Sequence, residues 1–415
     1  MPQLRILQIA HDHPDWTNGG TEIVARDLAR AINVQPDVSA RFLAAATRLQ
    51  RPEAIPGSLQ AFGEDFVIVT GAYDRFTMLR QDGSDWVTAL GKVLDVVRPD
   101  VVHLHGIDRI GAEVVYAIRR LAPDCRIILT LHDYQLICTN DGLMLTNEGQ
   151  LCTGASPDRC RRCVPAISAT RHALRKAHLM AILAQVDQII APSVFLRDVF
   201  VKWGLASDRI TLIANGVKAA PPLSPRERRP KRQRNRFAFF GNISRHKGVL
   251  VLLQAAARLA SGTETLRIDL HGGLGWADET FRTEFAAGLR DAATVAQHLG
   301  PYSRSDVSRL MRNYDWVVVP SLWWENAPLV ILEAQAAGIP VICSGVGGMA
   351  ELVTDGRTGL HVPPGDAASL AETLREAAGD ETLWARLAAS AYAPLHAAHV
   401  DQHLSLYRKL ARVSA

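Results

Sequence analysis

Short apolar runs alternate with amphipathic stretches along most of the chain. The amphipathic stretches include residues 21–33 and 85–97, whose apolar positions follow the helical period. The apolar runs of the first half are rich in Val, Ile and Leu and lie at residues 4–10, 100–106, 126–133, 188–193 and 209–217. Buried strands separated by helices predict a parallel sheet that is covered on both faces.

The alternation stops at residues 218–236 and then begins again. This segment is rich in proline and then in basic residues and has no apolar period, so we predict an interdomain linker. The apolar runs that follow lie at residues 237–243, 266–273, 315–321, 339–345 and 359–365. The pattern predicts an α/β fold of two tandem Rossmann-like, doubly wound parallel-sheet domains, with a ligand in the cleft between the carboxyl ends of their strands.

Chain length supports two domains, because 415 residues exceed what one ordinary core accommodates. We assign residues 1–217 to the first domain and residues 237–385 to the second. Residues 386–415 are expected to form C-terminal helices that pack back on the first domain.

Charge is distributed unevenly along the chain. The formal net charge is +4, but residues 226–236 hold seven basic residues against one acidic, so the remainder does not resemble a nucleic-acid-binding protein. We expect this run to be solvated surface, with a phosphate or lipid-headgroup contact as the alternative. The same two interpretations apply to Arg171, Arg175 and Lys176, which could share one face of a helix.

Targeting signals are not evident in the sequence. The N-terminus lacks a basic start followed by a long apolar stretch. The longest nearly uncharged stretch, residues 334–350, is interrupted by Gly and Pro, which argues against a membrane-spanning helix. We expect a cytoplasmic protein without a nucleic-acid partner, and peripheral contact with the inner membrane surface is an open alternative.

Two glutamates flank an apolar run of the second domain. In "PSLWWENAPLVILEAQAAG", Glu325 and Glu333 are eight positions apart, which is about 80° around one helix. Asn326 and Pro328, with Ala327 between them, fit a helix start, so we predict Glu325 in a loop and Glu333 inside the helix. Both carboxylates could then accept hydrogen bonds from a hydroxyl-rich ligand, while the helix start suits a diphosphate. The alternative is a surface acid near the helix dipole and an exposed helix residue.

A basic glycine turn lies further upstream in the same domain. Residues 239–259 give a strand, Gly241, a polar loop with Arg245 and Lys247, and then Gly248 and a helix. Two cations beside a glycine turn and a helix start predict a phosphate clamp that needs no metal.

The cysteines indicate a separate feature. Cys138, Cys152, Cys160 and Cys163 give a C-x13-C-x7-C-x2-C pattern in a polar insertion at about residues 134–168. Four thiolates could hold this insertion around a structural zinc ion. Free thiols and an iron–sulfur cluster are the alternatives.

The order of these motifs resembles a known family. The second half reads G-x-x-x-x-x-K-G, then P-S-x-x-x-E-x7-E-A-x-A-x-G-x-P-V, then the segment at residues 345–366. This order is similar to that of the retaining glycosyltransferases of the GT-B fold, family 4 (group 1). Residues 19–29, 129–133 and 213–217 also match, so the resemblance covers nearly the whole chain.

The resemblance implies that the second domain binds a nucleotide-sugar donor and the first an acceptor. It implies that Lys247 neutralises the donor diphosphate, that Glu333 binds the ribose, and that Glu325 touches and orients the transferred sugar. The family usually carries an arginine directly after the turn glycine, where this chain has Asn242. We therefore expect Arg245 to reach the phosphates instead.

In the first domain, His132 matches the histidine that contacts the donor sugar near the reaction centre in this family. It stands at the carboxyl end of a predicted strand, with Asp133 beside it. The alternative is a buried histidine that is satisfied by backbone. We take His132, Glu325 and Lys247 as the candidate catalytic residues.

Two further pairs in the first domain allow more than one interpretation. Gly19 and Gly20 permit close approach of the backbone to a diphosphate or acceptor, or form an ordinary turn. His103 and His105 share one strand face, where one could face the acceptor or both could be packed in the core.

The resemblance implies a retaining hexosyltransferase that moves a sugar from a UDP- or GDP-sugar to a hydroxyl of a carbohydrate or lipid-linked acceptor, in bacterial polysaccharide or glycolipid synthesis. No D-x-D motif occurs in the chain, and we expect no catalytic metal. The alternatives are a sugar phosphorylase or nucleotide-sugar epimerase on the same architecture, and a non-catalytic nucleotide-sugar-binding subunit.

Overall fold

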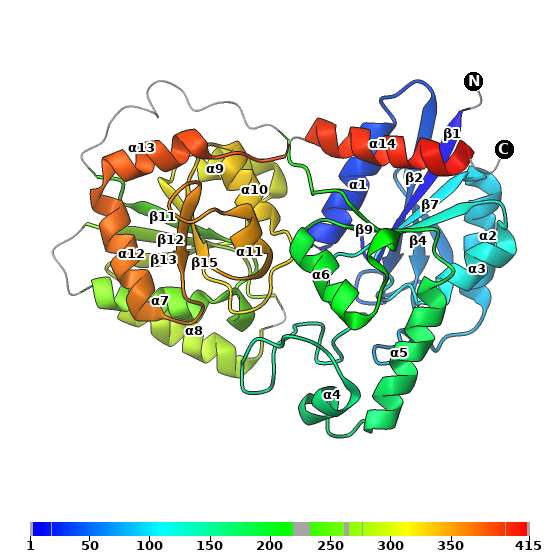
Figure 1. Cartoon of the computed structure of the whole chain (residues 1–415), viewed down its shortest axis with the longest axis horizontal. Coiled ribbons are helices and arrows are strands. Elements are labelled where there is room, and N and C mark those ends of the chain that lie inside the picture. Colours follow the sequence, from blue (N-terminus) through cyan, green and yellow to red (C-terminus); the bar gives the residue numbers. More distant parts are fainter. Residues whose placement is uncertain are drawn as a thin grey trace. The chain divides into compact units, whose positions relative to one another are not determined.

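The chain forms two compact units, each an α/β structure built on a parallel sheet (Figure 1). The computed structural model describes residues 3–17, 19–218, 233–260, 265–275, 277–394 and 396–412. Unit 1 comprises Met1–Ala214 and Ala397–Ala415, and unit 2 comprises Asn215–His396. The predicted fold class of two Rossmann-like doubly wound domains is therefore confirmed. Most of the predicted linker, residues 219–232, lies outside the described residues.

The described residues of unit 1 form an eight-stranded sheet with the order β10-β9-β8-β7-β1-β2-β4-β3. Its neighbouring strands are parallel except for the antiparallel pair β3 and β4. The strands are β1 (Leu4–Ala10), β2 (Val38–Ala46), β3 (Leu59–Phe62), β4 (Asp65–Val69), β7 (Val101–His105), β8 (Arg126–Thr130), β9 (Gln188–Ala191) and β10 (Ile210–Leu212). A small antiparallel pair is made by β5 (Tyr73–Asp74) and β6 (Leu79–Arg80).

Helices cover both faces of this sheet. The helices of unit 1 are α1 (Gly20–Ile32), α2 (Asp85–Val97), α3 (Val114–Leu121), α4 (Pro157–Cys163), α5 (Ala169–Leu183), α6 (Val194–Trp203) and the C-terminal α14 (His396–Arg412), with the 3-10 turn η1 (Ser207–Arg209). On one face, Ile6 and Ala10 of β1 share a core cluster with Leu28 of α1 and with Leu404 and Tyr407 of α14. Figure 1 shows α14 lying beside α1 and β1.

The alternation of side chains along β1 explains the second face. Ile9 points opposite to Ala10, and it lines a small cavity together with Trp86 and Leu90 of α2 and Val114 of α3. The sheet is thus buried on both sides, which accounts for its nearly continuous apolar strands.

Unit 2 has a six-stranded parallel sheet in its described part, with the order β13-β12-β11-β14-β15-β16. The strands are β11 (Arg236–Phe240), β12 (Arg267–His271), β13 (Ala296–Gly300), β14 (Trp316–Val319), β15 (Val341–Ser344) and β16 (Gly359–Val362). The helices are α7 (Val249–Leu259), α8 (Glu279–Asp291), α9 (Val307–Met311), α10 (Leu329–Ala336), α11 (Gly347–Leu352), α12 (Ala367–Gly379) and α13 (Glu381–Ser390), with the 3-10 turns η2 (Arg245–Lys247) and η3 (Arg304–Asp306).

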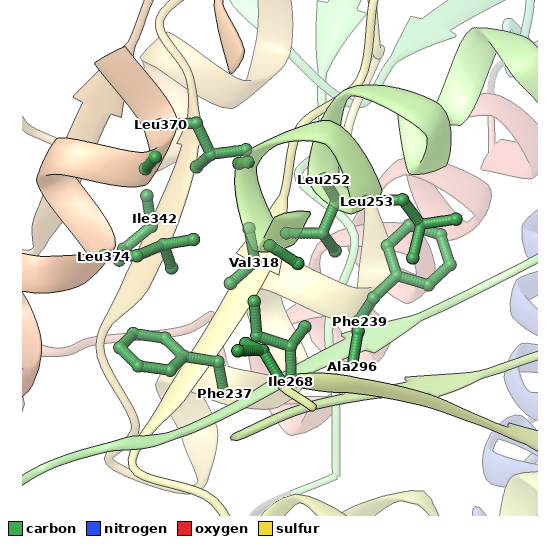
Figure 2. Packing of buried hydrophobic residues seen from close by; sticks show 14 of the residues in the cluster. Phe237, Phe239, Leu252, Leu253, Ile268, Ala296, Val318, Ile342, Leu370 and Leu374 are labelled. Atoms are coloured by element: carbon green, nitrogen blue, oxygen red, sulfur yellow. The ribbon is translucent and has the colours of Figure 1, made fainter. Parts of the chain in front are cut away.

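The two faces of the unit 2 sheet carry separate cores. Phe237 and Phe239 of β11 point into one cluster, which Leu252 of α7 and Leu374 of α12 also enter (Figure 2). The intervening residues of β11, among them Phe240, enter the other cluster with α9, α10 and α11. Alternation along a single strand therefore builds both layers.

The last residues of the predicted linker are part of the folded structure of unit 2. Arg236 begins β11, and Arg234, which the sequence placed in a basic run on the surface, is only 1% exposed. Its guanidinium donates to Glu381 at 3.0 Å and to Asp315 at 3.2 Å and stacks over the ring of Trp384. The solvated interpretation is thus wrong for Arg234, because tertiary partners bury and neutralise it.

Candidate functional site

Unit 2 reverses its strand order between β11 and β14. From β11 the chain winds outward through β12 and β13, and it then returns to β14 on the other side. In open α/β sheets, ligands bind beyond the carboxyl ends of the strands at such a switch point. The loops that follow these two strands carry Lys247 and Glu325, and Leu322 N donates to His246 O at 2.8 Å and joins the loops.

Glu325 is buried at the centre of this arrangement. Three donors converge on its Oε1 atom: Lys247 Nζ at 2.6 Å, Ser321 Oγ at 2.8 Å and Trp323 Nε1 at 2.8 Å. Burial opposes ionisation of the carboxyl, but the charge of Lys247 and these hydrogen bonds outweigh it and lower the pKa of Glu325. The sequence placed both residues in one site, and the structure brings them into direct contact.

Two glycines allow the loops of unit 2 to approach each other. Gly248 has a φ of +73°, and a Cβ atom there would lie 1.8 Å from Pro320 O. Gly348 N donates to Glu325 O at 2.7 Å, and a Cβ atom on Gly348 would lie 1.6 Å from Asn326 O. A side chain at either position would displace a loop that holds the Glu325 site.

The start of helix α10 lies between Glu325 and Glu333, as predicted. It begins at Leu329 with Pro328 as its N-cap residue, so Asn326 is not the cap and Pro328 stands just before the first turn. Glu333 lies in the second turn, is nearly buried, and forms an ion pair with Arg304 at 2.7 Å. The sequence offered no signal for Arg304, because it enters from a distant 3-10 turn. Ala327 lies in the same loop, between Asn326 and Pro328.

The basic turn after β11 does not place both cations together. Gly241 has a φ of +143°, and Asn242 is exposed. Arg245 is also exposed and pairs with Glu284 of α8 at 2.8 Å. Lys247 is therefore the cation that contacts Glu325, and Arg245 would have to leave Glu284 to reach phosphates near this pair.

Unit 1 has its own switch point between β1 and β7. Beyond the carboxyl end of β1, His11 Nε2 lies 2.9 Å from Glu22 Oε1 of α1. Burial disfavours the imidazolium, but the charge and hydrogen bond of Glu22 outweigh burial and raise the pKa of His11 to about 9. Sequence reasoning missed this ion pair; the available signal was a histidine directly after a strand and an acid two residues after Gly20.

Gly19 has a specific steric role here. A Cβ atom on Gly19 would lie 2.2 Å from Glu22 Oε2, so its small size makes room for the buried carboxylate rather than for a ligand in this structure. Gly20 is exposed and begins α1. Glu22 Oε2 and His11 Nδ1 are buried atoms without a hydrogen-bond partner in the described part of the chain.

Further charged groups gather around this pair. Asp108 and Asp133 lie close enough to add to its electrostatics, and burial raises the pKa of Asp133. Asp12 is buried and accepts from Arg109 Nη1 at 2.8 Å. His132 is also within electrostatic reach of Glu22, and burial, with the charge of His11, lowers the pKa of His132 to about 3.

The histidines of β7 connect to His132. His103 and His105 are fully buried, so neither is exposed to an acceptor. His105 Nδ1 lies 3.0 Å from His132 Nε2, and the two rings stack. His132 is thus held by a contact with another histidine.

Arg175 of α5 holds the loop that follows His132. It is buried, and its guanidinium donates to Gln135 O at 2.6 Å, to Leu136 O at 2.7 Å and to Phe76 O at 2.5 Å. Burial lowers the pKa of Arg175 to about 10. Neither sequence interpretation of this residue, a lipid contact or a wet surface, is correct, whereas Arg171 and Lys176 are exposed.

The cysteine insertion gathers its thiols into one region. Burial raises the pKa of Cys138 and Cys160, and the other cysteines of the group add to both shifts. The described residues nevertheless contain no group of three or more His, Cys, Asp or Glu side chains arranged to hold a metal ion. A structural zinc ion at Cys138, Cys152, Cys160 and Cys163 therefore stays a prediction from their spacing, and metal analysis of freshly purified protein tests it.

Two Rossmann-like units, each with polar groups at its switch point, define the class of GT-B proteins. The family models place the chain within this class: "Glycosyltransferase Family 4" matches residues 18–220 and "Glycosyl transferases group 1" matches residues 223–393. The chain belongs to the group 1 glycosyltransferases of family 4.

Curated relatives and solved structures agree with this assignment. A D-inositol 3-phosphate glycosyltransferase of Arthrobacter is 35% identical over 41% of this chain and 44% of its own length. A glycogen synthase of Mycobacterium tuberculosis is 28% identical over 71% of this chain and 64% of its own length. The matched region thus spans about half the length of the first of these relatives and less than two thirds of the second.

Among solved structures, the Anabaena protein HepE, in complex with UDP and glucose, superimposes with a TM-score of 0.68 at 19% identity. The alignment covers 98% of this chain and 100% of HepE, which supports the fold. Across the described part of the chain, every helix is too short or too polar to cross a membrane.

Proposed function

We propose that the protein is a retaining glycosyltransferase that moves a sugar from a UDP- or GDP-sugar to an acceptor hydroxyl, in bacterial polysaccharide or glycolipid synthesis. The observation that carries the proposal is the contact of Lys247 with buried Glu325 at the switch point of unit 2. A cation beside an oriented carboxylate suits a ligand with a diphosphate and sugar hydroxyls.

Each side chain of unit 2 has a role in this proposal. Lys247 neutralises charge that develops on the departing diphosphate. Glu325 accepts a hydroxyl of the transferred sugar; the three donors described above occupy Oε1, and Oε2 is the atom assigned to the sugar. Glu333 binds the ribose, and its ion pair with Arg304 opens or shifts when the diol binds.

The proposed reaction needs no enzymic nucleophile. The acceptor oxygen bonds to the anomeric carbon from the face that the diphosphate leaves, and a diphosphate oxygen takes the acceptor proton. The anomeric configuration is therefore retained. In unit 1, His132 contacts the reacting sugar, and the His11–Glu22 pair with Asp133 forms a polar surface for the acceptor hydroxyls.

The names of the relatives and neighbours suggest where to begin the search for a donor. HepE was solved with UDP and glucose, so UDP-glucose is the first probe and GDP-mannose the second. One relative is named for an inositol phosphate and the other for glycogen, and the acceptor is therefore sought among phosphorylated polyols, oligosaccharides and lipid-linked sugars.

The test measures thermal stabilisation by each nucleotide sugar and release of the nucleoside diphosphate with and without acceptor. We expect one donor to stabilise the wild-type protein and Glu325→Gln to lose turnover while Glu279→Gln, on the exposed start of α8, keeps it. Phosphate-dependent turnover without nucleotide would point to a phosphorylase. Donor binding with no release under any acceptor would contradict catalysis and favour a binding subunit.

A further inference from the structure

A line of buried polar side chains crosses the core of unit 1 and ends at His132. Gln8 of β1 and His103 and His105 of β7 lie on the sheet face that α14 covers, and Tyr407 of α14 joins them. Gln8, His103, His105 and Tyr407 are each fully buried. Buried polar groups cost free energy unless each finds a partner, so this line requires a consistent set of hydrogen bonds.

The hydrogen bonds at Tyr407 have one direction. Gln8 Nε2 donates to Tyr407 OH at 3.0 Å. Tyr407 is fully buried, so its hydroxyl proton needs an acceptor as well, and we assign that role to His103 Nδ1 at 2.6 Å. His103 then carries its proton on Nε2, which donates to Thr130 Oγ1 at 2.6 Å.

The donor and acceptor roles at Tyr407 also determine those of the hydrogen bonds that lead to His132. Because the Gln8 amide nitrogen faces Tyr407, its Oε1 atom accepts from His105 Nε2 at 2.8 Å. A neutral His105 with its proton on Nε2 has an accepting Nδ1 atom. His132 Nε2 must therefore donate to His105 Nδ1 across their distance of 3.0 Å.

The histidines of this line are neutral. Burial lowers the pKa of His105 and of His103 well below the usual histidine value, and neighbouring histidines add to the effect. The pKa of His132 is also low, at about 3. Each ring therefore carries one proton at neutral pH. When that proton is on one ring nitrogen, the other nitrogen is a hydrogen-bond acceptor.

We propose that Tyr407, Gln8 and His105 form a relay of directed hydrogen bonds that holds His132 as the tautomer with its proton on Nε2. Nδ1 of His132 is then an acceptor, the form that takes a hydrogen bond from a sugar hydroxyl. The relay residues are positioning residues, because they act on the reaction only through His132. The effect of the relay on catalysis rests on the function proposed above, whereas the expected tautomer of His132 does not.

The experiment reads the tautomer directly. Nitrogen-15 NMR of histidine-labelled full-length protein distinguishes protonated from unprotonated ring nitrogens, and His132→Gln assigns the signals. We expect a protonated Nε2 in the wild type. Gln8→Leu removes the acceptor of His105, so we expect the Nδ1-protonated form of His132 to appear and nucleotide release from UDP-glucose to fall about tenfold, or roughly 1.4 kcal/mol in the barrier.

Companion variants separate the relay from general damage to the fold. Tyr407→Phe is isosteric, removes the start of the relay and should also disturb the tautomer if Gln8→Leu does not fold. Tyr116→Phe changes an exposed tyrosine on α3 and should have no effect.

The outcomes are distinguishable. An unchanged His132 tautomer in both folded Gln8→Leu and Tyr407→Phe overturns the relay, whatever their turnover. A changed tautomer with unchanged turnover supports the relay and contradicts the catalytic role of His132 in the proposed function. A changed tautomer with reduced turnover supports both.

Discussion

The candidate sites of the two units occupy the same position relative to the sheet but consist of different chemical groups. Each places its candidate site where the strand order of its sheet reverses. In unit 2 the site is built on charge, since Lys247 and two hydrogen-bond donors fix the buried Glu325. In unit 1 a chain of neutral groups reaches His132, and the His11–Glu22 ion pair lies beside it.

This difference fits the different ligands that we propose. A diphosphate needs fixed positive charge, and a cation held by a carboxylate is ready without reorganisation. Sugar hydroxyls need acceptors and donors in defined places, which neutral side chains with fixed protons provide. The comparison predicts that charge changes damage unit 2 most, and that changes in tautomer or packing damage unit 1.

The largest effect is expected for Lys247→Met. It leaves the Glu325 carboxylate buried without its cation, which costs about 3 kcal/mol of stability and removes the charge assigned to the diphosphate. We expect nucleotide release from the cognate donor to fall about 10²- to 10³-fold. Steady-state release and thermal unfolding measure the two effects.

A double-mutant cycle gives the control for this prediction. Lys247→Met combined with Glu325→Gln removes both charges, so the double variant should recover stability relative to Lys247→Met alone. Lys202→Met, on the exposed surface of α6, should leave both measurements unchanged. Additive losses in the cycle would contradict a direct Lys247–Glu325 coupling.

A second large effect is expected for Gly348→Ala. The new methyl group would overlap Asn326 O and crowd Glu325 O, so the loop must move and carry the Glu325 side chain out of place. We expect donor turnover to fall about 10- to 100-fold, since a misplacement of about 1 Å costs roughly this much. Gly379→Ala, where the added methyl meets no atom within 4 Å, should retain turnover; equal activity in the two variants would show that the loop tolerates the methyl.

The sequence predicted the local structure around the two acids of unit 2, because its parts are neighbours in the chain. Glu325, Pro328 and Glu333 stand within one strand–loop–helix segment, and the spacing alone required a helix start between the two acids. Arg304, by contrast, reaches Glu333 from a separate turn, and no periodicity could show it. The helix cap was also misplaced by two residues, Asn326 being predicted where Pro328 is observed; helix ends are the least sharply defined part of a helix.

The unit 1 site could be predicted only in part, because its contacts join residues that are distant in the sequence. His132 follows a clear strand, but Glu22 looks like an ordinary acid in the first turn of α1. Strand β2, "VSARFLAAA", was missed because alanine has low strand propensity and its burial depends on α1 and β1. Arginines 175 and 234 were misjudged, because a basic residue reveals its buried partners only in three dimensions.

A moderate effect on stability is expected for Arg175→Met. The change removes charged hydrogen bonds to backbone carbonyls of the loop after His132, and we expect a loss of about 2 to 3 kcal/mol. Arg171→Met, on the exposed face of the same helix, should cost much less. Thermal unfolding and proteolysis within residues 134–168 measure both, and similar stability of the two variants would contradict the anchoring role.

The smallest effect is expected for Glu22→Gln and depends on pH. The raised pKa of His11, about 9, means that its charged pair with Glu22 stabilises fully below the ordinary histidine pKa of about 6.5. That contribution is lost as pH rises through about 9. Wild-type Tm should therefore fall between pH 7 and pH 10 by about 5 °C more than that of Glu22→Gln, in which burial keeps His11 neutral. Glu53→Gln, an exposed change in unit 1, should follow the wild type. Equal slopes for wild type and Glu22→Gln would show that unit 1 draws no stability from this charged pair.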